Sequence, residues 1–133
     1  MNPDNAVSGP RVLVVEDEVL VSWAVHDILS NLGYVVLGPV PSVAQALEAI
    51  AAQVPDAAVL DVNLRGEMSY PIADALAARG VPFVFSTGYE GDRLAEPYRV
   101  FPVLQKPLRQ AELGEALAKV LAVPPGAPIE RRT

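Results

Sequence analysis

Acidic residues, a hydroxyl and a lysine each follow a short apolar run in this chain. Glu16 and Asp17 follow the first run, Asp61 follows another, and Thr87 and Lys106 follow two more. Carboxylates that are brought together repel one another, and a raised pKa or a bound cation relieves that repulsion. Acidic oxygen clusters suit magnesium, while an ammonium and a hydroxyl can pair with phosphoryl oxygens. These residue types predict a phosphoryl-transfer site.

Asp61 is the candidate nucleophile of such a site. A carboxylate can form an aspartyl phosphate, and a nearby cation shields the charge that otherwise opposes attack on an anionic phosphodonor. Positioning and charge neutralisation supply most of the catalysis in phosphoryl transfer. The alternative for the acidic group is a solvated rim of loop carboxylates, which would be the stronger explanation for Asp61 taken alone.

The apolar runs before these residues indicate strands of a parallel sheet. Residues 11–15 form a nearly continuous run of β-branched and aliphatic side chains, as in a strand buried on both faces. Residues 18–32 have apolar positions at helical spacing and are followed by Gly33, a plausible C-cap. Further strands are expected at 34–37, 56–60, 82–86 and 101–104, and further helices after an N-cap at Ser42, over 71–79 and over 111–121.

Alternating units of this length predict an α/β fold with helices on both faces of a parallel sheet. In such folds ligands gather at the carboxyl ends of the strands. One unit, residues 88–102, contains two glycines and two prolines and has poor helical periodicity, so a short or mobile fourth helix is expected. Residues 1–10 and the proline-rich 123–133 are expected to be flexible tails around one domain at 11–122, without an output domain.

The bulk composition excludes several classes of function. The 133 residues carry a formal net charge of −6 and no basic stripe, which disfavours direct binding to nucleic acid. Cysteine is absent, so no disulfide or thiolate metal site can form, and the composition suits a reducing cytoplasm. Without a secretion signal or an apolar run of membrane-spanning length, a cytoplasmic protein without membrane insertion is expected.

Four short motifs in this order resemble the response regulator receiver family. They are Val-Glu-Asp-Glu at 15–18, Leu-Asp-Val-Asn-Leu at 60–64, Ser-Thr-Gly at 86–88, and Lys106-Pro107. Each motif alone is weak, but the ordered set, each at the end of the appropriate strand, is specific, and the resemblance covers about residues 11–122. It implies a flavodoxin-like, doubly wound, five-stranded parallel sheet of the (βα)5 type.

The resemblance also implies a magnesium site at the strand ends. Glu16 and Asp17 resemble the acidic pair of the family and Asp61 its phospho-acceptor. The backbone carbonyl of Asn63 resembles the third protein ligand to the ion, beside the carboxylates. Glu16 is longer than the more frequent aspartate, which changes the reach of the carboxylate and not its charge.

Two further residues resemble those that respond to phosphorylation in this family. Thr87 resembles the switch hydroxyl, and Lys106 resembles the invariant lysine, aimed by a cis bond to Pro107. Three residues before the lysine the family usually has an aromatic residue, whereas this chain has Val103, so the usual coupling between threonine and aromatic lacks one partner. Residues 82–89 also resemble a subgroup named FAT GUY, with a serine in place of its alanine, whose members are typically stand-alone receivers.

The resemblance implies a single-domain response regulator that accepts a phosphoryl group on Asp61 from a histidine kinase or histidine phosphotransferase. Such a protein is a phospho-acceptor rather than an enzyme with a free substrate, with self-catalysed transfer and slow hydrolysis of the aspartyl phosphate. It signals by altered contacts with a downstream protein. The alternative is a receiver-fold module that docks on a partner without phosphorylation, against which intact Asp61, Thr87 and Lys106 argue.

Two other functions fit the residues poorly. A phosphatase of the dehalogenase type needs a second aspartate as general acid two positions after the nucleophile, where this chain has Asn63. A flavodoxin-like mononucleotide binder needs a hydroxyl- and glycine-rich loop after the first strand, where Glu16, Asp17 and Glu18 would repel the phosphate. Trp23 and His26 fall off the apolar stripe of the first helix, and only Trp23 is a candidate for docking to a phosphodonor.

Overall fold

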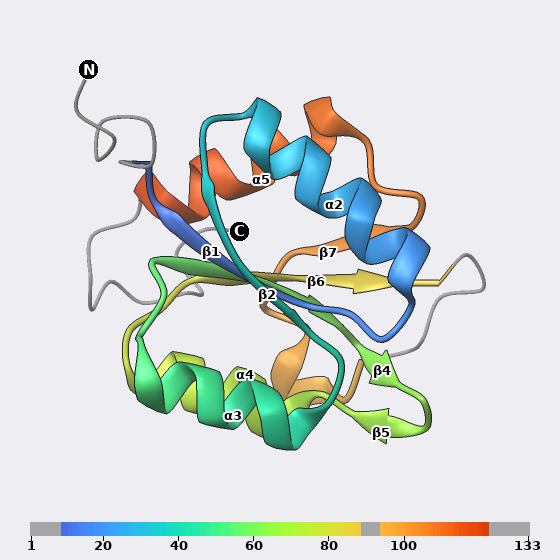
Figure 1. The fold of residues 1–133 in the computed structure, drawn as a ribbon. Helices are drawn as coiled ribbons and strands as arrows, with labels where there is room; N and C mark the ends of the chain where they lie inside the picture. The colour runs from blue at the N-terminus through green and yellow to red at the C-terminus, as the bar shows by residue number, and fades with distance from the viewer. Residues whose placement is uncertain (1–8, 89–93, 123–133) are drawn as a thin grey trace.

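A computed structural model describes residues 9–88 and 94–122 and shows a five-stranded parallel sheet between two layers of helices (Figure 1). The strand order is β2-β1-β3-β6-β7, and every neighbouring pair in this sheet is parallel. This arrangement confirms the predicted doubly wound α/β class. The strands are β1 (Arg11–Val15), β2 (Val35–Val40), β3 (Ala57–Asp61), β6 (Phe83–Thr87) and β7 (Val103–Gln105).

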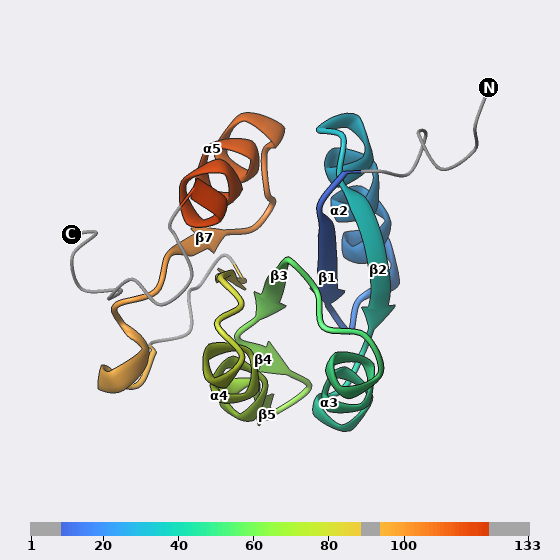
Figure 2. The same cartoon turned by 90° about the vertical axis from the view of Figure 1, so that its left-hand side faces the viewer.

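The described residues contain four α-helices, and they lie in pairs on the two faces of the sheet (Figure 2). On one face lie α2 (Val19–Asn31) and α5 (Gln110–Ala122), and on the other lie α3 (Val43–Ala52) and α4 (Tyr70–Ala78). The predicted caps are present: the Gly33 amide donates to the Ser30 carbonyl after α2, and Ser42 Oγ accepts from the Gln45 amide at the start of α3. Within the described residues, no helix is both long and apolar enough to span a bilayer.

The core has two apolar layers because successive side chains of a strand point to opposite faces. In β1, Val12 and Val14 pack on the side of α2 and α5, whereas Leu13 and Val15 pack on the side of α3 and α4. Every residue of β3 and β6 is buried, down to the polar residues at their carboxyl ends. The strand ends that carry the candidate site are therefore fixed from both sides.

The edge strand β2 extends further than the sequence predicts. The strand expected at 34–37 continues through Gly38 and Pro39 to Val40, and its pairing with β1 is irregular between Leu13 and Val15. Gly38 has φ +91°, and a Cβ at this position would lie 2.9 Å from the Val14 carbonyl oxygen. Only glycine fits such a close backbone approach with positive φ.

A small hairpin that the sequence did not predict follows β3. It consists of β4 (Asn63–Leu64) and β5 (Glu67–Met68), which pair antiparallel. The two turn residues, Arg65 and Gly66, have φ of 55° and 92°. Positive φ at both central positions is the geometry of a type I′ turn, the connection that best matches the twist of paired strands.

The fourth β-α unit is irregular, as predicted. From Leu94 onward it holds only a 3₁₀ turn, η1 (Glu96–Tyr98), and the strand expected at 101–104 begins at Val103. Tyr98 stacks on Tyr70 of α4 with ring centroids 4.1 Å apart, and its hydroxyl donates to Asp74. Residues 89–93 of this unit, and nearly all of the tails expected at 1–10 and 123–133, lie outside the described residues.

Candidate functional site

Lys106 joins the carboxyl ends of two strands that are far apart in the chain. Its Nζ lies 2.7 Å from Oε1 of Glu16 and 3.0 Å from Oδ2 of Asp61. The side chains of Glu16, Asp61 and Lys106 are only 3, 7 and 12% exposed. One ammonium therefore faces two carboxylates in a place with little water, and a net negative charge remains.

Burial and the neighbouring charges together shift the pKa of all three groups. Burial raises the pKa of Glu16 from 4.5 to about 7, and the neighbouring Asp61 charge adds to the effect, although the Lys106 hydrogen bond opposes it. Burial likewise raises the pKa of Asp61, again against the Lys106 hydrogen bond. For Lys106 burial favours the neutral amine, but its hydrogen bonds to Glu16 and Asp61 outweigh that and raise its pKa. A second cation would therefore be stabilised here.

The structure brings together three consecutive carboxylates after β1. One oxygen each of Glu16, Asp17 and Glu18 lies within 4.8 Å of the other two, and within the described residues no other cluster of potential metal ligands is this tight. Glu18 was not among the ligands expected from the sequence, although it is adjacent to them. Its amide donates to Glu16 Oε2 at 3.1 Å, which fixes the approach of the two residues.

The other two expected magnesium ligands, Asp61 and Asn63, lie at the end of β3 and the start of β4. Asp61 Oδ1 accepts a long contact of 3.4 Å from the Asn63 amide, while Oδ2 faces Lys106. Asp61 is outside the tight cluster but is close enough to Asp17 for that charge to raise its pKa further. The donors are all oxygens, several are buried, and their charge is not matched, which fits a hard cation such as magnesium.

Thr87 is the last residue of β6 and pairs with Gln105 of β7, the residue before Lys106. It is 4% exposed, and its Oγ1 donates to the carbonyl of Gly88 at 2.9 Å. Its own carbonyl accepts a hydrogen bond from the Lys106 amide at 2.8 Å. The backbone thus places Thr87 and Lys106 at the same end of the sheet, with the threonine hydroxyl turned to the next peptide rather than to Asp61.

Sequence reasoning missed Arg65, the first turn residue of the β4–β5 hairpin. Its Nε lies 3.4 Å from Asp17 Oδ2, and its Nη2 donates to the Asp17 carbonyl, also at 3.4 Å. The only sequence signal was Gly66, which follows it as a turn residue. The hairpin therefore adds a second positive charge to the site.

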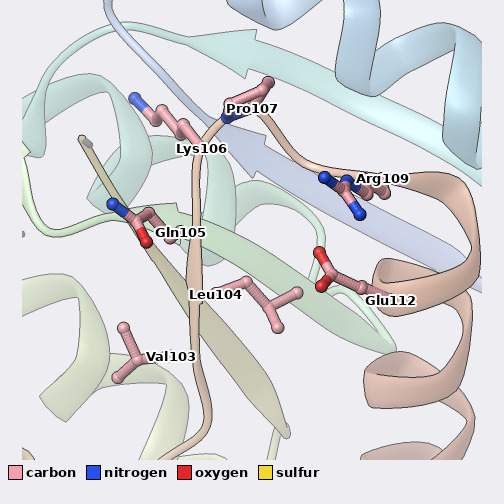
Figure 3. Close-up of a pocket in the computed structure, with 7 residues that line it drawn as sticks. All are labelled: Val103, Leu104, Gln105, Lys106, Pro107, Arg109 and Glu112. Carbon is pink, nitrogen blue, oxygen red and sulfur yellow. The ribbon is translucent and has the colours of Figure 1, made fainter.

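A pocket of about 380 Å³ adjoins the site on the side of β7 and α5 (Figure 3). Of the predicted site residues only Lys106 lines it, and its side chain points away from Arg109 and Glu112. Val103, in the position of the expected aromatic, is 43% exposed at the other end of the pocket. The Lys106–Pro107 bond is cis, as the resemblance implied. The pocket is therefore a neighbouring surface and not the site itself.

The start of α2 exposes an apolar patch beside the acidic loop. Val19 is 61% exposed, Leu20 75% and Trp23 63%. His26, in contrast, is an exposed residue whose Nδ1 lies 3.9 Å from the carboxylate of Asp27. His26 and Trp23 are thus both at the surface, and Trp23 belongs to an exposed apolar patch.

Comparisons with known proteins agree with this geometry. The family described as "Response regulator receiver domain" matches residues 12–118. The solution structure of SdrG from Sphingomonas melonis Fr1 is 45% identical with a TM-score of 0.78, covering 87% of this chain and 98% of that one. A BeF3-activated conformation of SdrG from Pseudomonas melonis Fr1 is 43% identical, with a TM-score of 0.72 and 84% and 96% coverage. Curated proteins gave no significant match.

A third structure extends the likeness to a more distant relative. The CheY-like response regulator receiver domain from Methylobacillus flagellatus is 26% identical, with a TM-score of 0.74, and the alignment covers 84% of this chain and 98% of that one. The fold is thus shared at low as well as at moderate identity.

Proposed function

The chain belongs to the response regulator receiver family, and we propose that it accepts a phosphoryl group on Asp61 with the help of magnesium. The observation that carries this proposal is the bridge from Lys106 to both Glu16 and Asp61. It keeps the Asp61 carboxylate buried but partly neutralised, as a nucleophile toward an anionic donor must be. SdrG, which is similar to this chain, has a BeF3-activated conformation, and this supports a phosphorylation-dependent signal here.

The phosphodonor is a phosphohistidine of a histidine kinase or histidine phosphotransferase. An oxygen of Asp61 forms a bond to phosphorus while the phosphorus–nitrogen bond breaks, and the histidine nitrogen leaves with the electron pair and takes up a proton. Glu16, Asp17, Asp61 and the carbonyl of Asn63 would hold magnesium, with Glu18 beside them. The bound ion would offset the negative charge of donor and acceptor.

Lys106 and Thr87 carry the signal from the acceptor to the surface. Once Asp61 becomes an acyl phosphate, its charge moves outward onto the phosphoryl oxygens, and the Lys106 ammonium follows that charge. Thr87 can rotate its hydroxyl from the Gly88 carbonyl to a phosphoryl oxygen, because the present hydrogen bond is a single local one. These movements would alter the segment after Gly88 and the β7–α5 surface, where a downstream partner would bind.

Intact mass spectrometry tests the acceptor directly. We expect one phosphoryl adduct, an increase of about 80 Da, after incubation with acetyl phosphate and magnesium. The adduct should be absent from Asp61→Asn and after chelation, but retained in Asp27→Asn, since Asp27 has an 83% exposed side chain on α2. An adduct that survives in Asp61→Asn would show that another residue is the acceptor.

The apolar patch at Val19, Leu20 and Trp23 favours a second candidate, a module that docks on a partner without phosphorylation. The same experiment separates the two functions. No adduct in the wild-type chain, with the fold intact by circular dichroism, would favour the docking module.

A further inference from the structure

Arg65 adopts a backbone conformation that is unusual for its residue type. Among the described residues it is the only one other than glycine with positive φ. For an L-residue this conformation is strained because Cβ crowds the following carbonyl oxygen, and such strain concentrates where a side chain has a task. The hairpin holds the strain in place, because the Gly66 amide donates to Asn63 Oδ1 and β4 pairs with β5.

The turn directs the Arg65 guanidinium to the outer side of the acidic cluster. It contacts Asp17 twice, through Nε to Oδ2 and through Nη2 to the backbone carbonyl, both at 3.4 Å. The Asp17 side chain is only 9% exposed, while that of Arg65 is 80% exposed. The arginine thus covers an inward carboxylate from the solvent side with a loose contact, well above the 2.7–2.9 Å of a strong charge-assisted hydrogen bond.

We infer that Arg65 is a positioning residue that competes with a divalent cation for Asp17 and so weakens cation binding in the unphosphorylated protein. This inference rests on the proposed function, since it assigns Asp17 to the magnesium site. Lys106 occupies Glu16 and Asp61 from the inside, and Arg65 occupies Asp17 from the outside. An arriving cation displaces the exposed arginine more readily than the buried lysine.

The competition follows from charge and geometry. A cation that takes an Asp17 oxygen removes the partner of the guanidinium and also repels it. The guanidinium can swing into water at little cost because most of its side chain is already solvated. The contact therefore lowers cation affinity without closing the site.

Magnesium affinity measured by nuclear magnetic resonance tests this inference without any phosphoryl transfer. We would titrate magnesium into wild type and Arg65→Asn, and follow the amides of residues 15–18 and 61–66. Asparagine tolerates positive φ and removes the charge, so the hairpin should be retained. Because the Arg65–Asp17 contact is an exposed ion pair, we expect its removal in Arg65→Asn to lower the dissociation constant for magnesium about two- to fivefold.

Arg79→Ala is the matched control, because it changes the net charge equally. Arg79 follows α4 and donates to the Ala75 carbonyl, away from the acidic cluster. The dissociation constant of Arg79→Ala for magnesium should equal that of wild type. Arg65→Lys keeps the charge and should stay closer to wild type than Arg65→Asn does.

Salt separates the direct contact from a change in loop structure. The difference between wild type and Arg65→Asn should shrink when the ionic strength rises from about 0.01 to 0.15 M, as the Debye length falls from about 30 to 8 Å. Equal or weaker binding by Arg65→Asn, with wild type binding magnesium, would overturn the role of Arg65 alone. No binding by wild type at any magnesium concentration would overturn the magnesium site itself.

Discussion

Asp61 ends β3 and Lys106 directly follows β7, but the molecule holds these two strands very differently. β3 lies in the middle of the sheet between β1 and β6, and all five of its residues are buried. β7 has three residues, pairs with β6 alone, and contains no buried residue. Asp61 thus ends a fully buried central strand, whereas Lys106 follows an edge strand.

The difference matches the two tasks that the proposed function assigns to these residues. An acceptor carboxylate must stay at a fixed position relative to a cation, and central burial achieves this. A residue that reports a new charge must be able to move, and a short edge strand with an adjoining pocket allows that. We call β3 with Asp61 the fixed half of the site and β7 with Lys106 the movable half. The contacts of Lys106 with Glu16 and Asp61 join the two halves.

The largest expected contrast comes from truncating one side chain in each strand. Leu60→Ala in β3 should lower the free energy of unfolding by about 4 kcal/mol, because Leu60 is fully buried and leaves a cavity. Val103→Ala in β7 should cost less than about 1 kcal/mol, because Val103 is 43% exposed. Urea unfolding of both variants measures the contrast, and equal losses would remove the distinction between the strands.

Removing the link between the halves should have the next largest effect. Lys106→Met leaves the buried Glu16 and Asp61 carboxylates without their ammonium, and we expect a loss of about 3 kcal/mol at pH 7. The loss should be smaller at pH 5, where Glu16 is protonated. Lys119→Met is the control, since the Lys119 side chain is 71% exposed. A pH-independent loss would indicate that packing, rather than charge, holds Lys106.

The charge of Glu16 should give a pH dependence of stability without magnesium. Its pKa is about 7 in the folded protein and 4.5 as a free group, so the folded state binds this proton more tightly. The stability that the proton contributes is complete below about pH 4.5 and is lost as the pH rises through about 7. The free energy of unfolding should fall by at most about 3 kcal/mol over this pH range.

Glu16→Gln tests that sign because glutamine does not titrate. The stability of wild type relative to Glu16→Gln should fall between pH 4.5 and 7 in urea unfolding. Parallel pH curves for the two proteins would show that the pKa of Glu16 is not raised.

The smallest effect is expected at the aromatic stack beside the movable half. Tyr98→Phe keeps the ring on Tyr70 and removes the 2.9 Å hydrogen bond to Asp74, which should cost about 1 kcal/mol or less. Amide hydrogen exchange should become faster at residues 94–102 and stay unchanged in β3. Faster exchange in both regions would show that they unfold together.

The sequence predicted the enclosed parts of the fold better than the exposed parts. β1, β3 and β6 lie within one residue of their expected bounds, because a strand buried on both faces is a continuous apolar run. β7 begins two residues later than expected, since the Phe101 amide bonds to the Tyr98 carbonyl and Val103 is the first residue paired with β6. Local contacts with the preceding turn are not visible in hydrophobic periodicity.

The candidate site shows the same limit. The order of the motifs predicted that Glu16, Asp61, Thr87 and Lys106 lie at one end of the sheet, where the structure places them. It could not show that the longer Glu16 reaches Lys106 at 2.7 Å, because that depends on side-chain length across two strands. The hairpin that carries Arg65 was missed because an arginine is rare at a positive φ and gives no turn signal.

The irregular strand β2 has a consequence for contacts between molecules. An open sheet edge presents amide and carbonyl groups that can pair with a strand of another chain and start aggregation. Gly38 turns the β2 backbone with φ +91°, and the next residue, Pro39, has no amide hydrogen to donate. At the opposite edge β7 offers only three residues. Both borders of the sheet are thus poor templates for strand addition, which lets a signalling protein accumulate without polymerising through its sheet.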